Sequence, residues 1–120
     1  MHRVLIAVAA LTMVFLTSGS AATPPSITLT PNPVTRGHSV VITGSAGGCA
    51  VGNRVSIISK AFVHTHDFAG LPAVLAKVKY GGHFRVTTRI PATKRPGRYT
   101  VTARCGGGNL GLLKHLTVRR

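Results

Sequence analysis

His83-Phe-Arg-Val-Thr-Thr-Arg-Ile90 and Arg98-Tyr-Thr-Val-Thr-Ala-Arg-Cys105 are the two stretches that decide the fold, because both alternate in character from residue to residue. Apolar side chains such as Phe84, Val86 and Val101 fall on one face, whereas Arg and Thr side chains fall on the other. A period of two residues is that of a β-strand. Polar residues along one face indicate an antiparallel sheet with that face in water.

Five more runs rich in Val, Ile and Thr surround these two, with Gly, Pro and Asn between them. They span Ser26–Thr30, Ser39–Thr43, Arg54–Ser59, Val74–Tyr80 and Leu112–Arg119. No segment after residue 22 keeps a helical period of 3.6 residues. Seven short strands at this spacing predict an all-β fold, an immunoglobulin-like antiparallel β-sandwich. Between two of the runs, Tyr80-Gly-Gly-His83 predicts a tight hairpin.

Residues 1–22 have the pattern of an export signal. A basic start, Met-His-Arg, precedes an apolar run from Val4 to Leu16, and small residues occupy Ser20 and Ala22. Such a pattern predicts cleavage after Ala22, and the apolar run is shorter than the roughly 20 residues that a membrane span needs. We therefore expect a secreted, extracellular protein with one domain at 23–120, not an integral membrane protein.

Two cysteines, Cys49 and Cys105, both lie in the expected exported part. An even number of cysteines in an oxidising compartment favours a disulfide. Successive antiparallel strands alternate in direction, so the loop after the second run and the loop after the sixth emerge at the same end. The sequence therefore predicts a Cys49–Cys105 bridge at that end.

Several phrases of the sequence resemble the secreted Ig-like domains of actinobacteria. They are Ile27-Thr-Leu-Thr-Pro-Asn-Pro-Val-Thr-Arg-Gly37, Val40-Val-Ile-Thr-Gly44, Gly82-His-Phe-Arg-Val86 and Arg95-Pro-Gly-Arg-Tyr-Thr-Val-Thr-Ala-Arg-Cys105, followed by Gly-Gly-Gly-Asn109-Leu. The resemblance covers nearly all of residues 23–120 and implies an Ig-like fold and export. Two features depart from antibody-type domains, because the chain has no Trp and its Cys pair falls in end loops.

Charge is the strongest functional signal, since fifteen Lys and Arg stand against one carboxylate, Asp67. One carboxylate excludes the paired acids of most glycosidases and an all-carboxylate cage for Ca²⁺. Strand alternation predicts outward-facing cations on both sheets. One sheet is expected to carry Lys77, Lys79, Arg85 and Arg89, and the other Arg54, Arg98 and Arg104.

Six of these cations, Lys77, Lys79, Arg85, Arg89, Arg98 and Arg104, are the residues we expect to bind polyanions. The expected partners are anionic cell-wall polymers or other extracellular polyanions, with the protein associated with the cell envelope. No aromatic residues interleave with the cations to stack bases, so sequence-specific nucleic-acid binding is not expected. The oligomeric state stays open.

Two alternatives use other residues. His64 and His66, two apart in an extended loop, could share a Zn²⁺ or Cu²⁺ ion with Asp67 as a third ligand, which would make the protein a metal-binding module. The glycine-rich loops 44–53 and 105–111 could instead form a small-ligand site beside the predicted bridge.

Catalysis has little support in the sequence. No Gly-x-Ser-x-Gly elbow is present, and Asp67 is the only acid that could orient a histidine. The expectation is a non-catalytic protein without a resident cofactor.

Overall fold

The computed structural model describes residues 23–120. The predicted export signal, residues 1–22, therefore lies outside the described residues. Within the described part of the chain, no helix is long and apolar enough to cross a membrane.

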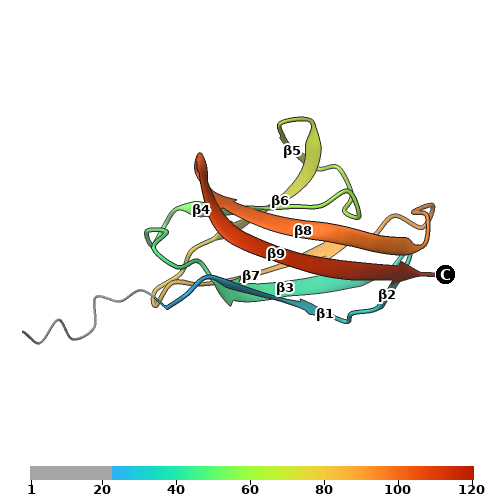
Figure 1. Ribbon diagram of the computed structural model, residues 1–120, viewed down its shortest axis with the longest axis horizontal. Helices are drawn as coiled ribbons and strands as arrows, with labels where there is room; N and C mark the ends of the chain where they lie inside the picture. Colours follow the sequence, from blue (N-terminus) through green and yellow to red (C-terminus); the bar gives the residue numbers. More distant parts are fainter. Residues whose placement is uncertain (1–22) are drawn as a thin grey trace, which may run out of the picture.

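Nine strands in residues 23–120 form two sheets, which lie one above the other in Figure 1. The three-stranded sheet has the order β1 (Ser26–Thr30), β3 (Ser39–Ser45), β7 (His83–Arg89). The six-stranded sheet has the order β2 (Val34–Thr35), β9 (Gly108–Arg119), β8 (Gly97–Cys105), β4 (Arg54–Ile58), β6 (Leu71–Lys77), β5 (His66–Phe68). All pairings are antiparallel apart from that of β2 with β9. The all-β prediction is confirmed.

The apolar faces of the two sheets meet in one core. Val40 and Ile42 of β3 and Val101 and Ala103 of β8 are completely buried in it, as is Leu116 of β9. The alternation in the two deciding stretches is confirmed, since Phe84 and Val101 are buried whereas Arg85 and Arg98 are exposed. Side-chain burial of this kind is the main favourable contribution to folding.

The first predicted run is β1, and after it the chain crosses at residues 31–33 to β2 in the other sheet. Asn32 holds this crossing against β9: its Nδ2 donates to the carbonyl oxygen of His115 at 2.9 Å, and its Oδ1 accepts from the N–H of Thr117 at 3.0 Å. The short strand β2, which the sequence did not predict, then runs parallel to β9.

The predicted tight turn at Tyr80–His83 is present, but the strands that it joins do not pair with each other as a hairpin. β6 pairs with β4 in one sheet and β7 pairs with β3 in the other. Val78 keeps the incoming chain beside β4, because its N–H donates to Asn53 O and its carbonyl accepts from Gly52 N, each at 2.8 Å. The Gly81-Gly82 turn has positive φ angles at both glycines and closes with the single bridge between Lys79 and His83, so it joins the two sheets.

Two further strand boundaries differ from expectation. β6 spans Leu71–Lys77, whereas the predicted run was Val74–Tyr80. It begins earlier because a short strand, β5, precedes it and forms a hairpin with it through Ala69 and Gly70. The segment after Cys105 was expected to be a loop. It is a tight turn at 106–107 that leads directly into β9, with Cys105 and Gly108 as paired residues.

The predicted disulfide is confirmed. Cys49, in the loop after β3, is bonded to Cys105, the last residue of β8, and their Cα atoms are 5.9 Å apart. Cys49 is buried and belongs to the core cluster. The bond joins two segments 56 residues apart in sequence, and β3 and β8 belong to different sheets. It therefore fastens the two sheets together at one end.

We expect the double change Cys49→Ser and Cys105→Ser to lower the free energy of unfolding by about 4 kcal/mol, because the unfolded chain regains the freedom that a long closed loop removes. Urea unfolding of the oxidised protein and the double variant measures the difference. A loss below about 1 kcal/mol would contradict the role assigned to the bond.

Gly44, on β3, is a position where the three-stranded sheet has no room for a side chain. A Cβ at this position would overlap the carbonyl oxygen of Ser26 and lie 2.8 Å from the ring of Phe84. We expect Gly44→Ala to destabilise the protein by about 1–3 kcal/mol or more. Gly48→Ala is the matched control, because a Cβ there has no heavy atom within 4 Å. Equal melting temperatures for the two variants would refute this packing argument.

Candidate polyanion-binding surface

The cations of this protein have almost no internal counter-charge. Residues 23–120 contain every Lys and Arg of the chain apart from Arg3, and Asp67 is their only side-chain acid. The one salt bridge in the described part of the chain joins His64 to Asp67. No Lys or Arg side chain in that part is therefore neutralised by an ion pair.

The six predicted cations occupy both sheets. Arg85 and Arg89 are exposed on the outer face of the three-stranded sheet, and Arg98 is exposed on that of the six-stranded sheet, as expected. The sheet expected for Lys77 and Lys79 was wrong. Lys77 ends β6 and lies opposite Arg54 in the six-stranded sheet, and Lys79 lies in the turn between β6 and β7. The misassigned hairpin explains this difference, because β6 pairs with β4 and not with β7.

Arg104 differs from the other predicted cations because it is only partly exposed. Its guanidinium carbon lies 5.1 Å from the centre of the Phe68 ring, within the range of a cation–π contact. Phe68 belongs to β5, so the β5–β6 hairpin approaches the outer face of β8. The Nε of Arg104 is buried and has no hydrogen-bond partner among the described residues. This pairing of an aromatic ring with a cation was not predicted.

A second group of cations surrounds Tyr99 at the start of β8. Lys94 donates from Nζ to the carbonyl oxygen of Lys60 at 2.7 Å, and Nζ lies 6.0 Å from the centre of the Tyr99 ring. The hydroxyl of Tyr99 donates to the carbonyl oxygen of Arg95. We call Lys60, Lys94, Arg95 and Arg98 the basic cluster. The basic run Lys94-Arg95-Pro-Gly-Arg98 was the sequence signal for it, but Lys60 is distant in sequence and the prediction missed the group.

Two adjoining hollows lie among the residues of the basic cluster, and a third lies apart from them. One, of about 370 Å³, lies between Leu71 and β8 and is lined by Arg98, Thr100 and Thr102. An adjoining hollow of about 460 Å³ shares Lys60 and Tyr99 with it. A third, of about 480 Å³, contains Arg54 and Ser56 further along β4.

Exposed apolar side chains accompany the cations on this face. Leu71 is 37% exposed and Leu113 is 61% exposed, and Leu113 lies opposite Thr102 on the neighbouring strand. The outer face thus combines guanidinium groups, hydroxyls and apolar side chains, which together suit a polymer with charged groups joined by carbon atoms.

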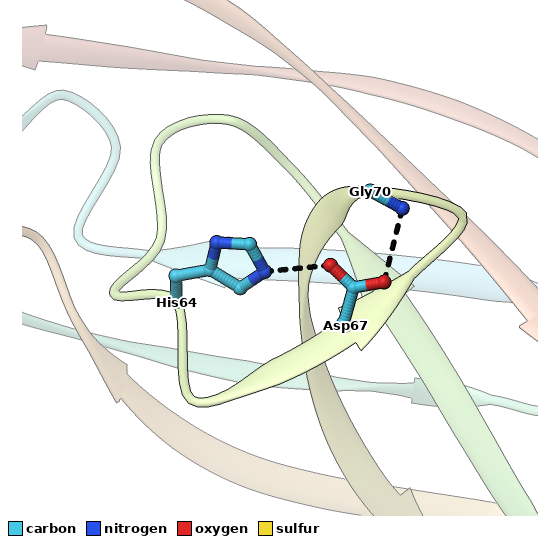
Figure 2. Close-up of polar contacts among 3 residues, drawn as sticks. All are labelled: His64, Asp67 and Gly70. Carbon is cyan, nitrogen blue, oxygen red and sulfur yellow. Dashed lines mark hydrogen bonds and ion pairs between the residues drawn. The ribbon is translucent and has the colours of Figure 1, made fainter.

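The histidine loop forms a different arrangement (Figure 2). Nε2 of His64 lies 2.8 Å from Oδ1 of Asp67, and the N–H of Gly70 donates to Oδ2 at 3.0 Å. The hydrogen bond from Gly70 and then that from His64 hold the pKa of the Asp67 carboxyl below its usual value. The carboxylate therefore stabilises the turn of the β5–β6 hairpin by accepting a hydrogen bond from its backbone.

His66, which was expected to share the metal ion with His64, does not join this pair. His66, on β5, lines a separate hollow together with Val74 and Leu75 of β6. Residues 23–120 contain no group of three His, Cys, Asp or Glu side chains placed to hold a metal ion. The structure brings together His64 and Asp67 but not the full set of three residues.

The glycine-rich end contains two hollows beside the disulfide. Gly47, Gly48 and Cys49 line one hollow with Gly81 and Gly82. Cys105, the other cysteine of the disulfide, lines a second hollow with Gly106, Asn53 and Arg54. The two predicted loops thus meet in the second hollow, beside the disulfide, whereas the first hollow is lined by residues 47–51 and the Gly81-Gly82 turn without the loop after Cys105.

Comparisons with known proteins identify a fold but no family. No protein-family model matches the chain, and no curated protein matches it. Among solved structures, the chain is similar to part of the Pseudomonas fluorescens alkylpurine DNA glycosylase AlkC bound to DNA containing an abasic site analog, with a TM-score of 0.53 and 19% identity. The similarity covers 85% of this chain and 31% of the glycosylase chain, so this chain spans about a third of that protein. At this identity the likeness concerns the fold alone.

We expect the β5–β6 hairpin to loosen in acid. Because the pKa of Asp67 is lowered in the folded hairpin, its contribution is complete above about pH 4 and is lost as the pH falls through the lowered value. Hydrogen exchange at the Gly70 amide, followed by NMR between neutral and acid pH, measures this loss. Asp67→Asn is the control and should remove the pH dependence. Unchanged protection of Gly70 in Asp67→Ala would contradict the assigned contact.

Proposed function

We propose that residues 23–120 form a secreted, non-catalytic Ig-like domain that binds anionic polymers of the cell envelope through its cationic surface. The observation that carries this proposal is the absence of internal neutralisation: within the described residues, no Lys or Arg forms a salt bridge. Like charges kept together in one small domain repel one another and reduce its stability. A polyanion removes that repulsion when it binds.

The strand arrangement supports the Ig-like part of the proposal. A three-stranded sheet faces a larger sheet. Within residues 23–120 the chain passes from one to the other five times, before β2, β3, β4, β7 and β8. Secretion is supported by the leader pattern at residues 1–22 and by the disulfide, which persists in oxidising compartments.

The size of the charge favours a partner over solubility alone. A small domain needs a net charge of about 2–8 in magnitude to stay soluble, whereas the full chain carries +14. Binding through many phosphate or carboxylate contacts is independent of sequence and depends strongly on salt. The solved glycosylase structure contains DNA, but only the fold is shared at this identity, so DNA enters our proposal only as one polyanion among others.

Retention of the purified, oxidised protein on bacterial cell walls tests the proposal. We expect strong retention at low salt, a steep fall as salt rises, and loss of retention after the anionic polymers are stripped from the walls, because binding releases counter-ions. Retention that changes neither with salt concentration nor with removal of the anionic polymers would point to a shaped site for another wall component. No retention at any salt concentration would overturn the proposal.

A further inference from the structure

We infer that one extended, phosphate-bearing chain binds along a single face of this protein, in a groove on the outside of the six-stranded sheet. This inference rests on the proposed function and specifies its site and ligand. We define the β8 groove by the outward side chains of β8 together with the basic cluster, Ser56 and Ile58 of β4, and Phe68 and Leu71 of the β5–β6 hairpin.

Register places cations at both ends of the groove. On β8, Arg98, Thr100, Thr102 and Arg104 are alternate residues and share the outer face. At about 3.3 Å per residue, the Cα atoms of Arg98 and Arg104 are about 20 Å apart. The two threonine hydroxyls lie between them, and Ser56 lies opposite Arg104 on β4. An extended chain following β8 would thus meet a guanidinium at each end and hydroxyl donors between them.

Arg104 has the features of an anchor for one anionic group. Its contact with Phe68 orients the guanidinium, and its Nε has no acceptor among the described residues. A partly buried arginine normally forms hydrogen bonds with protein acceptors. Because Nε itself is buried, an anionic group would bind at the two terminal nitrogens of the guanidinium, and such a planar group can contact two oxygens of a phosphate at once.

The basic cluster supplies the other end of the groove. Lys60 and Arg98 line the hollow beside Leu71, and Lys60 continues into the hollow that contains Lys94 and Arg95. Four positive charges from two segments, Lys60 and the run 94–98, therefore meet around Tyr99. The cluster attracts anionic groups strongly, because none of the residues that line these two hollows has a carboxylate that would offset the positive charge.

The apolar side chains and the size of the hollows select the kind of chain. Ile58 and Leu71 line the hollow of about 370 Å³, and Leu113 is exposed beside it on β9. These side chains can contact the carbon atoms that link successive phosphates. Hollows of this size suit small groups, such as single units of a flexible chain.

The outer face of the three-stranded sheet provides the internal comparison. Its cations, Arg85 and Arg89, both lie on the edge strand β7, and Arg89 already donates from Nε to the carbonyl oxygen of Gly37 at 3.2 Å. Arg85 is exposed and has the same charge as Arg98. The variants Arg98→Gln and Arg85→Gln are therefore a matched pair, since each removes one exposed positive charge from a strand of a different sheet.

Calorimetric titration with linear poly(glycerol phosphate) at one fixed low salt concentration tests the inference. We expect Arg98→Gln and Arg104→Gln each to weaken binding by about tenfold, as the loss of a charge-assisted contact does, whereas Arg85→Gln weakens it by about twofold or less. Circular dichroism checks that each variant is folded. If Arg104→Gln unfolds, Arg98→Gln alone decides the comparison.

Equal weakening by Arg98→Gln and Arg85→Gln would overturn the groove and leave diffuse binding by the whole cationic surface, in agreement with the proposed function. A DNA duplex with the same number of phosphates should bind more weakly than the linear chain and should not distinguish the two variants. Tighter binding of the duplex, with the same preference for Arg98 over Arg85, would overturn the single-chain ligand. If the unaltered protein binds neither this polymer nor cell walls at low salt, the proposed function itself fails.

Discussion

A single carboxylate, Asp67, stands among the Lys and Arg side chains of this domain, and its two oxygens are bonded to His64 and to the N–H of Gly70. Electrostatics therefore cannot hold this fold together through ion pairs. Repulsion among the cations must be offset by burial of apolar surface and by the disulfide, and it is reduced by salt. The same constraint leaves the cations available to an external partner.

The fold meets this constraint by fastening its two sheets to each other. Apolar side chains from both sheets fill one core, and the bond between Cys49 and Cys105 joins the end of β8 to the loop after β3. Asn32 links the crossing between β1 and β2 to β9 at the other edge. β8 is central to the function proposed here, because its inner face is buried in the core and its outer face carries Arg98 and Arg104.

Local patterns in the sequence predicted the elements that depend on local information. Alternation located β7 and β8 and the outward side of Arg85 and Arg98, and the cysteine count with strand direction predicted the disulfide. The failures depend on long-range pairing. Tyr80-Gly-Gly-His83 has the residues of a hairpin turn, but the bonds of Val78 with Gly52 and Asn53 hold the preceding chain in the other sheet. Periodicity within one run cannot reveal which strand will be its neighbour.

The same limit explains what was missed in the candidate site. Arg104 and Phe68 are far apart in sequence and come together only because the β5–β6 hairpin approaches the outer face of β8. Lys60 joins Lys94 and Tyr99 through tertiary contacts in the same way. The predicted cations were chosen by strand parity, which identifies the outward side of a residue but not how cations from separate strands are grouped.

The central claim is that the protein binds an anionic chain with the unpaired cations on one face, the outer face of the six-stranded sheet. NMR chemical-shift mapping of the labelled protein during titration with linear poly(glycerol phosphate) tests it most directly. The account predicts that shift changes concentrate in β4, β8, the β5–β6 hairpin and the loop containing Lys94 and Arg95, while β1, β3 and β7 change little. Changes of equal size over both sheets would contradict the account.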